Sequence, residues 1–366
     1  MFLIATRNFP PDIGGMQVLM GGLSESLVNH GPVKVFTYEH PNANIYDKKS
    51  PINIERVKGI KLFRKYRKAN LINNFLSTNN NIRALFADHW KSLELIKDEN
   101  LKKTKTFCLL HSKEINHEIG SSLNKRVIKS TNNADFIIAN SNFTKELAIK
   151  IGIDPLKIKV IFPGVQIPKN IDNKFNSQAK EIFKDSFPKI ITVARLEKRK
   201  NHSKILMTVK NLKSKFPNIK YISIGSGEEE NNLKKLSKEL SLEKEVIFLK
   251  NVEEDLKLAL ISSSNLFLMP SVRENKSVEG FGISYIEAAS YGVGSIGGKD
   301  GGEADAIIHN ETGLICDGNN LNSIYETTIN FFTSNKSEKF GKAALKFSED
   351  FHWGKVVKKY LKLIND

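Results

Sequence analysis

Short apolar runs recur along the chain, each followed by polar or turn residues and then by a helical pattern. Residues 2–6 read FLIAT and lead into a loop containing prolines and glycines, after which apolar residues recur at helical spacing over 16–28. Residues 33–38 (VKVFTY) form the next apolar run. Runs of this length separated by a helix are typical of buried parallel strands. The pattern therefore predicts the order strand, loop, helix, strand, which begins a parallel α/β sheet.

The same alternation continues to the end of the chain in two cycles, separated by a polar stretch at 168–188. Because each cycle is long enough for one sheet, we expect an α/β protein of two Rossmann-like domains that face across a cleft. The further strands that we expect lie at 82–87, 106–110, 135–139, 158–162, 189–194, 221–225, 246–249, 266–270 and 294–298.

Composition supports this organisation. The chain has 366 residues, of which 40% are hydrophobic, and this length suits two cores better than one. It contains no apolar segment of the ~18–20 residues that a membrane span needs, and its N-terminus lacks the basic region of a signal peptide. Two cysteines, Cys108 and Cys316, are too few for a disulfide framework or a zinc site. We therefore expect a reducing, cytoplasmic location.

The formal net charge of +16 is unevenly distributed. Residues 1–165 contain 25 basic and 14 acidic residues (net +11), whereas residues 166–366 contain 31 and 26 (net +5). Segment 56–68 (RVKGIKLFRKYRK) has seven basic residues, no acidic one and interleaved apolar residues. This pattern suits an amphipathic helix or basic loop on an anionic membrane surface. The alternative is a solvated basic helix whose apolar residues pack on the sheet.

The loop and helix at 270–292 (PSVRENKSVEGFGISYIEAASYG) carry the strongest candidate chemistry. Gly-Phe-Gly follows Glu279, and an amphipathic helix begins near Ile283. The N–H groups of Gly282 and Ile283 would then be free at a helix N-terminus, an arrangement that binds phosphate. Glu279 stands just before this helix and Glu287 about one turn inside it, where a carboxylate can accept hydrogen bonds from sugar hydroxyls. Alternatively, both are ordinary carboxylates of the helix and its N-terminus.

A second candidate follows the first strand of the second cycle, in the sequence TVARLEKRKN at 192–201. Arg195 follows the strand directly and Lys200 comes five residues later. An arginine and a lysine so placed can converge on a diphosphate, the arginine as a bidentate donor and the lysine as a point charge. Both could equally be solvated surface cations, like their neighbours Lys198 and Arg199.

The first cycle offers two weaker candidates. Gly14 and Gly15 precede its first helix, and paired glycines let a backbone approach a ligand closely. A plain strand-to-helix turn explains them equally well. His111 follows the strand TFCLL, where a histidine can face a cleft, although a structural histidine is the more frequent case.

Together these segments are similar to the retaining, metal-independent family-four glycosyltransferases of the GT-B fold, in register over nearly the whole chain. Within this family the chain most resembles GDP-mannose-dependent mannosyltransferases that act on phosphatidylinositol mannosides. The resemblance implies domains at 1–167 and 168–349, with a closing helix at 350–366 that packs back on the first domain. The segments that carry it are FPPDIGG, NADFIIANSNFTKELAIKIGI, VIFPGV, VARLEKRKN, GSGEE, VEGFGISYIEAASYG, GGKDGGEADAIIHNETGLICDG and FHWGKVVKKYLKLI.

The resemblance also implies how the donor is bound. Arg195 and Lys200 match the basic pair that holds the donor diphosphate. Glu287 matches the carboxylate that binds the nucleotide ribose. Gly282 and Ile283 match backbone donors to phosphate and sugar.

The remaining candidates match residues around the donor sugar. Glu279 and His111 match groups that contact it, and Gly14 and Gly15 match the loop that approaches donor phosphate and acceptor. Asp305 stands where the family motif G-G-x-x-E has glutamate, which leaves the donor sugar open. The catalytic set implied by the resemblance is Glu279, His111, Arg195 and Lys200.

The family implies a hexosyltransferase that needs neither metal nor cofactor. We expect mannose or glucose to move from GDP-mannose or a UDP-sugar to a lipid-linked or cell-envelope glycan acceptor, with retention of configuration. Such an enzyme is either free in the cytoplasm or peripheral on the inner face of the membrane. A nucleotide-sugar epimerase or hydrolase of the same fold is the alternative. A basic nucleic-acid-binding protein is disfavoured, because the sequence contains no recognisable nucleic-acid module.

Overall fold

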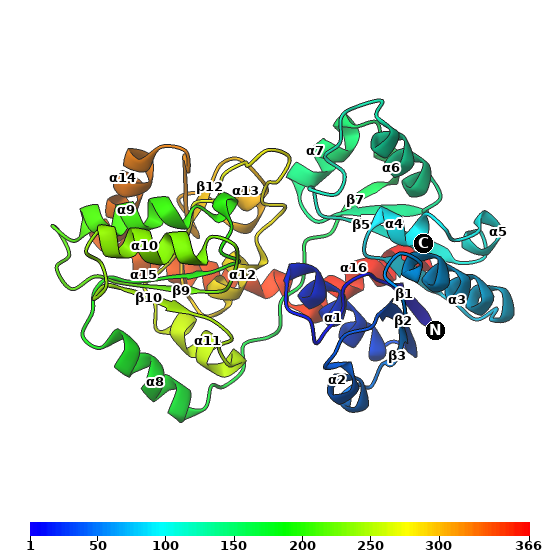
Figure 1. The fold of residues 1–366 in the computed structure, drawn as a ribbon, viewed down its shortest axis with the longest axis horizontal. Helices are drawn as coiled ribbons and strands as arrows, with labels where there is room; N and C mark the ends of the chain where they lie inside the picture. The colour runs from blue at the N-terminus through cyan, green and yellow to red at the C-terminus, as the bar shows by residue number, and fades with distance from the viewer. The chain divides into compact units, whose positions relative to one another are not determined.

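The computed structural model describes residues 1–366 apart from the side chain of Ser334, and it divides them into two compact units (Figure 1). Unit 1 comprises residues 1–166 and 351–366, and unit 2 comprises residues 167–350. This division lies one residue from the expected domain boundary, and it groups the C-terminal helix with the first domain. Each unit is an open parallel sheet with helices on both faces.

Unit 1 contains a seven-stranded parallel sheet of order β3-β2-β1-β4-β5-β6-β7. Its central strands are fully buried because helices cover both faces, which explains their continuous apolar sequences. The strands are β1 (Phe2–Ala5), β2 (Val33–Tyr38), β3 (Asn53–Val57), β4 (Ala84–Ala87), β5 (Lys105–Leu110), β6 (Phe136–Ala139) and β7 (Ile158–Val160).

One hydrophobic cluster of unit 1 joins the sheet to α1 and α16, and the other joins it to α3–α7. The N-terminal helices are α1 (Gly15–Val28), α2 (Ala43–Lys49), α3 (Arg64–Thr78), α4 (Trp90–Leu93) and α5 (Asp98–Leu101). They are followed by α6 (Ser122–Asn132), α7 (Asn142–Lys150), the short helix η1 (Pro155–Lys157) and, at the C-terminus, α16 (Trp353–Asn365).

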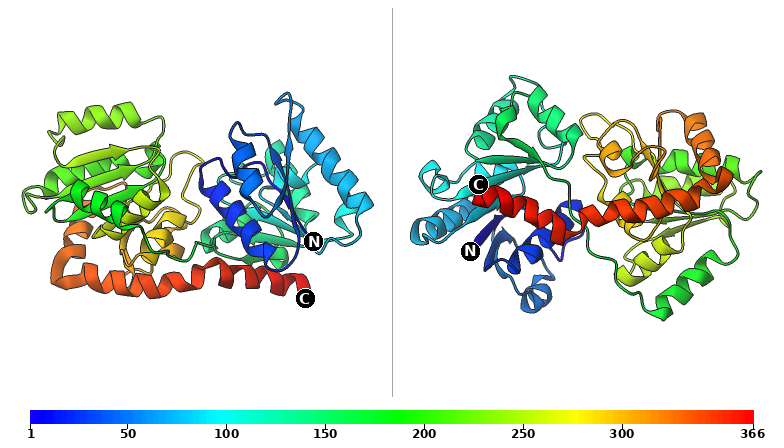
Figure 2. Two further views of the ribbon diagram at one scale, coloured as in Figure 1. Left: turned by 90° about the horizontal axis from the view of Figure 1, so that it is seen from below. Right: turned by 180° about the vertical axis from the view of Figure 1, so that it is seen from behind.

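Helix α16 fastens the end of the chain to unit 1, beside α1 (Figure 2). Trp353 fits against backbone, because a Cβ on Gly22 would lie 2.1 Å from the indole Nε1 and one on Gly164 would lie 2.4 Å from its ring. Tyr360 meets Phe86 edge to face, with ring centroids 5.7 Å apart. The aromatic residues of the closing segment therefore complete the core of unit 1.

Unit 2 contains a six-stranded parallel sheet of order β10-β9-β8-β11-β12-β13. This is the Rossmann strand order, in which the direction of winding reverses between β8 and β11. The strands are β8 (Lys189–Val193), β9 (Lys220–Ile224), β10 (Val246–Leu249), β11 (Leu266–Met269), β12 (Ser295–Gly298) and β13 (Gly313–Cys316).

One core of unit 2 packs α9, α10, α14 and α15 on the sheet, while α8 packs against α11. The helices are α8 (Asn173–Phe183), α9 (His202–Leu212), α10 (Glu230–Glu239), α11 (Glu254–Ser262), α12 (Ile283–Ser290), α13 (Glu303–Ala306), α14 (Leu321–Phe332) and α15 (Lys336–Ser348). The short helices are η2 (Lys198–Lys200), η3 (Thr333–Asn335) and η4 (Glu349–Phe351), the last running into unit 1.

The segment 56–68 differs from the single amphipathic helix or loop that its sequence suggested. Residues 56–57 end β3, a turn follows, and α3 begins only at Arg64. The edge strand β3 was not predicted, because it is short, polar and half-exposed. The helices formed by the described residues include none with the length and apolar character of a membrane span.

Candidate functional site

The predicted donor-binding residues of unit 2 come from loops at the carboxyl ends of β8 and β11. Arg195 and η2 follow β8, while Glu279 lies between β11 and α12. Strand order reverses between these two strands, and ligands of open α/β sheets bind in the crevice at such a point. The topology therefore brings together two segments about 80 residues apart in the sequence.

Glu279 is held by two buried cations. The Lys200 ammonium and the Arg199 Nη1, the latter 2.9 Å away, both donate to Glu279 Oε2. The three side chains are 9–12% exposed. Although burial opposes it, Lys200 and Arg199 lower the pKa of Glu279 to about 2. Glu279 is therefore a carboxylate at neutral pH, fixed within the crevice rather than solvated at its mouth.

The ion pairs continue outward from Glu279 to Arg195. Glu197 accepts from the Arg199 Nε at 3.1 Å and from the Arg195 Nη1 at 2.6 Å. The Arg195 side chain is 64% exposed, so it can reorient toward an incoming anion. The idea that Arg199 is a solvated cation is wrong, because the turn of η2 directs its side chain inward beside Lys200. Sequence reasoning missed Arg199 and Glu197, since a run of charged residues does not show which ones are buried.

The loop before α12 has the geometry that the Gly-Phe-Gly sequence predicted. Helix α12 begins at Ile283, after Gly282 with φ 94°. A Cβ on Gly282 would lie 2.4 Å from the Tyr285 ring, so this position requires glycine. The Tyr285 N–H donates to the Gly282 carbonyl oxygen, so it is the N–H groups of Ile283 and Ser284 that are available to a phosphate.

Glu287 has a charged partner that the sequence did not reveal. The Lys257 Nζ, on α11, lies 3.6 Å from Glu287 Oε1 and 2.8 Å from Glu254 Oε1. Although burial opposes it, the carboxylates of Glu287 and Glu254 raise the pKa of Lys257. Lys257 therefore fixes the orientation of the Glu287 carboxylate, to which the family resemblance assigns the binding of the nucleotide ribose.

A second buried acid, Glu303, lies behind this loop. Its side chain is fully buried, and among the described residues neither oxygen has a hydrogen-bond partner of normal geometry. Burial, and then the neighbouring Glu279, raise the pKa of Glu303 to about 8. Glu303 is therefore largely neutral at pH 7. Sequence reasoning noted Asp305 in this motif and passed over Glu303.

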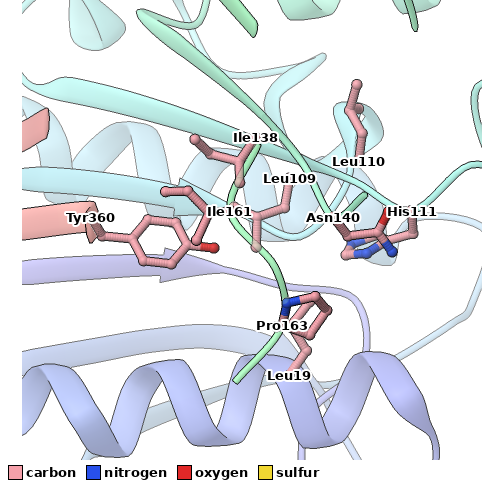
Figure 3. Close-up of a pocket in the computed structure, with 9 residues that line it drawn as sticks. All are labelled: Leu19, Leu109, Leu110, His111, Ile138, Asn140, Ile161, Pro163 and Tyr360. Carbon is pink, nitrogen blue, oxygen red and sulfur yellow. The ribbon is translucent and has the colours of Figure 1, made fainter. Parts of the chain in front are cut away.

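In unit 1, His111 directly follows β5 and is half-buried. Its Nε2 lies 2.9 Å from the carbonyl oxygen of Asp88, and its backbone N–H donates to Glu114 Oε1. Figure 3 shows its imidazole beside Asn140, at one end of a small pocket whose other end is closed by Tyr360. These contacts fix the position of the imidazole at the carboxyl end of β5.

The paired glycines differ from each other in their surroundings. Helix α1 begins at Gly15, so both lie at its N-terminus. A Cβ on Gly14 would lie 2.5 Å from Gln17 Oε1, whereas a Cβ on Gly15 would meet nothing within 4 Å. The backbone at Gly15 is therefore open to an approaching molecule. Asp12 steadies the turn, since it accepts hydrogen bonds from Ile13 and Gln17.

The predicted site residues thus form two groups, one in each unit. Unit 2 brings together the residues assigned to the donor: Arg195, Lys200, Glu279, Gly282, Ile283 and Glu287. Unit 1 holds Gly14, Gly15 and His111. Within the described residues, no group of three or more histidine, cysteine or carboxylate side chains is arranged to hold a metal ion.

Two parallel-sheet domains with these strand orders define the GT-B class of fold. A solved structure from Anabaena, Alr3699/HepE in complex with UDP-glucose, superposes with a TM-score of 0.81 over 100% of this chain and 99% of that one, at 17% identity. Residues 13–167 match the model described as Glycosyltransferase Family 4, and residues 173–347 match Glycosyl transferases group 1. The chain therefore belongs to the glycosyltransferase family that these two models describe, and it is a glycosyltransferase.

Curated relatives span nearly the same length. A GDP-mannose-dependent alpha-(1-6)-phosphatidylinositol monomannoside mannosyltransferase of Mycolicibacterium smegmatis is 21% identical over 88% of this chain and 86% of its own length. A protein of the same description from Mycobacterium tuberculosis is 22% identical with the same coverage.

Proposed function

We propose that this protein is a retaining hexosyltransferase that takes its sugar from a nucleotide diphosphate sugar. The observation that supports this most directly is the buried cluster of Lys200, Arg199 and Glu279 at the carboxyl ends of β8 and β11. Arg195 and the N-terminus of α12 add an exposed cation and free N–H groups at the same crevice. This set suits a diphosphate next to a sugar, with cations for the former and a carboxylate for hydroxyls of the latter.

In the proposed reaction the bond between the anomeric carbon and the diphosphate oxygen breaks, and a bond to the acceptor oxygen forms on the same face. The leaving diphosphate takes the proton of the acceptor hydroxyl, so no side chain has to act as base. Lys200 and Arg195 balance the charge that develops on the leaving group, and Glu279 orients the sugar. We propose that these groups fulfil this role without a metal ion, which predicts full activity in excess chelator.

Two known donors are candidates for this chain, and they differ in both the nucleotide base and the hexose. The curated relatives use GDP-mannose, whereas the Anabaena structure holds UDP-glucose. Thermal unfolding in the presence of GDP-mannose, UDP-glucose, GDP and UDP distinguishes them, because a ligand that binds only the folded chain raises its apparent stability. No stabilisation by any of these compounds would contradict the proposal. NMR of the product then reports the anomeric configuration, and inversion would contradict the retaining mechanism.

We propose a lipid-linked or cell-envelope glycan acceptor, reached from the inner membrane surface. Around the turn before α3, Ile60, Leu62 and Phe63 are 70%, 72% and 53% exposed, so they do not pack on the sheet. Exposed apolar residues next to Lys61 and Lys65 are typical of a surface that enters an anionic interface. Two cations of segment 56–68 take no part, because Arg56 pairs with Asp47 and Lys68 is buried.

A nucleotide-sugar epimerase or hydrolase would share the nucleotide site but need no acceptor. Consumption of the donor is therefore measured with and without membrane lipid extract. The glycosyltransferase proposal predicts a new glycolipid and donor consumption that depends on the extract. Equal consumption without any acceptor would favour the alternative.

A further inference from the structure

We propose that unit 1 carries a second anion site, formed by Arg7, Arg64 and Lys91, which binds a phosphate group of the acceptor. The assignment of this anion to the acceptor rests on the proposed function. The site lies at the carboxyl ends of β1 and β4, the point where the strand order of the first sheet reverses. It is separate from the diphosphate cluster, which belongs to unit 2.

Backbone contacts fix Arg7 and Lys91 at the same edge of the sheet. Strands β1 and β4 pair directly; Asp88 follows the last residue of β4, and Arg7 lies two residues after the end of β1. The Arg7 N–H donates to Asp88 Oδ2 at 2.8 Å. The Lys91 N–H donates to the His89 Nδ1 at 2.9 Å, which begins the short helix α4. These two side chains therefore start from neighbouring, well-anchored positions.

Arg64 reaches this edge through Tyr38, the last residue of β2. The Arg64 guanidinium carbon lies 5.1 Å from the centre of the Tyr38 ring, and the Lys68 Nζ lies 4.7 Å from it. The buried Lys68 ammonium also donates to the Thr6 carbonyl at 2.7 Å. Lys68 is thus fixed beneath the cluster, and it adds positive charge without being free to contact a ligand.

These cations lack the carboxylates that usually accompany such a group. Among the described residues, no carboxylate forms an ion pair with Arg7, Arg64 or Lys91. Glu94, which is near Lys91, is held by Arg126 at 2.6 Å. Asp88 is a second carboxylate beside the cluster, and it already accepts from Thr6, Ser92 and the Arg7 N–H. Asp88 therefore offsets part of the charge and leaves the cluster positive.

Arg7 and Lys91 are close enough to affect one another, and the charges of Arg7 and Arg64 both act on Tyr38. Burial, and then the Arg7 guanidinium, lower the pKa of Lys91. The His89 pKa falls to about 2 through burial and the charges of Arg7, His111, Lys91 and Lys68. Such mutual repulsion is relieved when an anion binds between the cations.

A phosphate ester suits this arrangement better than a carboxylate. Arg7 and Arg64 are half-buried and Lys91 is exposed, so their donors remain accessible to an anion. Two planar guanidinium groups and one ammonium, arriving from three separate elements, can surround the several oxygens of a tetrahedral group. An acceptor held here would be a phosphate monoester or diester, either a lipid headgroup or a soluble sugar phosphate.

The test uses inorganic phosphate titrated into the full chain by calorimetry, with saturating GDP and UDP present to occupy the nucleotide site. We expect one phosphate to bind per chain. Arg64→Ala should weaken this binding about tenfold or more, because it removes a charge-assisted donor. Arg64 is the first residue of α3, where a cation is unfavourable to the helix dipole, so this variant should fold. Arg7→Gln is the second variant.

Lys102→Ala is the matched control, since it removes one exposed cation of unit 1 outside the cluster. Equal weakening in this control would mean that only the net charge of the chain attracts phosphate, and it would overturn the proposal. Unchanged binding in both Arg64→Ala and Arg7→Gln would also overturn it. Because the titration needs no sugar transfer, its result is independent of whether the donor proposal holds.

Competition distinguishes the two sources of the phosphate. One competitor is sn-glycerol 3-phosphate, with glycerol as its control. The other is vesicles of phosphatidylglycerol, with phosphatidylcholine vesicles as their control. Displacement by the soluble ester alone assigns a soluble acceptor, and displacement by phosphatidylglycerol vesicles assigns a lipid headgroup. If neither displaces inorganic phosphate, the site holds an adventitious ion only and the proposal fails.

Discussion

The Arg199 guanidinium donates to Glu279 across 2.9 Å, to the same carboxylate oxygen that accepts from Lys200. Arg199 is therefore a positioning residue, since it fixes the carboxylate that we assign to the donor sugar. Burial makes this role costly to lose, because an incompletely paired charge would stay inside the crevice.

Arg199→Ala should lower the free energy of unfolding by about 1–3 kcal/mol at pH 7, because Glu279 keeps only one cationic partner. The pKa of Glu279 is lowered to about 2 in the folded chain, below its ordinary value of 4.5. Its contribution to stability is therefore complete above pH 4.5 and lost as the pH falls toward 2. Urea unfolding at pH 7 and pH 3 should show the difference between wild type and variant shrinking with acid. A difference that grows instead would contradict the ion-pair role.

Lys200→Ala should slow sugar transfer by about 10²–10³, which is the range for losing one preorganised charge at a developing anion. Single-turnover rates with saturating donor measure this effect apart from binding. Lys198→Ala is the matched control, because Lys198 lies two residues away in the same short helix but is exposed. Near-normal turnover in Lys200→Ala would contradict the assignment of Lys200 to the donor diphosphate.

Glu303→Gln should change how stability depends on pH. The pKa of Glu303 is raised to about 8 from an ordinary 4.5, so the folded chain keeps a proton that the unfolded chain has lost. This contribution is present below pH 4.5 and is lost as the pH rises toward 8. Relative to the glutamine variant, the free energy of unfolding of the wild type should fall by about 1.4 kcal/mol per pH unit between pH 5 and 8. Parallel stability curves for the two proteins would mean that Glu303 titrates normally.

Replacing Ile60, Leu62 and Phe63 together by serine should reduce binding to phosphatidylglycerol vesicles at least tenfold, because each buried apolar side chain contributes roughly 1.5–3 kcal/mol. Vesicle co-sedimentation measures the effect. Leu156→Ser is the control, since Leu156 is 85% exposed elsewhere in unit 1. Binding that survives the triple replacement would place the membrane contact elsewhere or exclude it.

Trp353→Ala should destabilise unit 1 by about 3–5 kcal/mol, the cost of a large cavity in a core. Gly22→Ala should also destabilise the wild type, because the new Cβ would meet the indole Nε1 at 2.1 Å. In the Trp353→Ala background the same glycine replacement should cost little. Thermal unfolding of the four proteins measures this coupling, and independent effects would contradict the packing.

The sequence was sufficient for the elements whose patterns are local. The buried strands are apolar runs, and the N-terminus of α12 follows from Gly-Phe-Gly, so Gly282 and Ile283 could be placed at this N-terminus, and Glu279 just before it, from the sequence. The edge strand β3 was missed, because one solvated side leaves no continuous apolar run. Strand β13, with the sequence GLIC, was also missed.

Only the tertiary structure decided which charged residues act together. Lys198, Arg199 and Lys200 are three adjacent cations in the sequence, and burial of the last two against Glu279 depends on how η2 meets the loop after β11. The physical reason is that ion pairing depends on distance and desolvation between segments far apart in the chain. A sequence records the charges of the residues, whereas the fold determines which of them lose water and which partners they find.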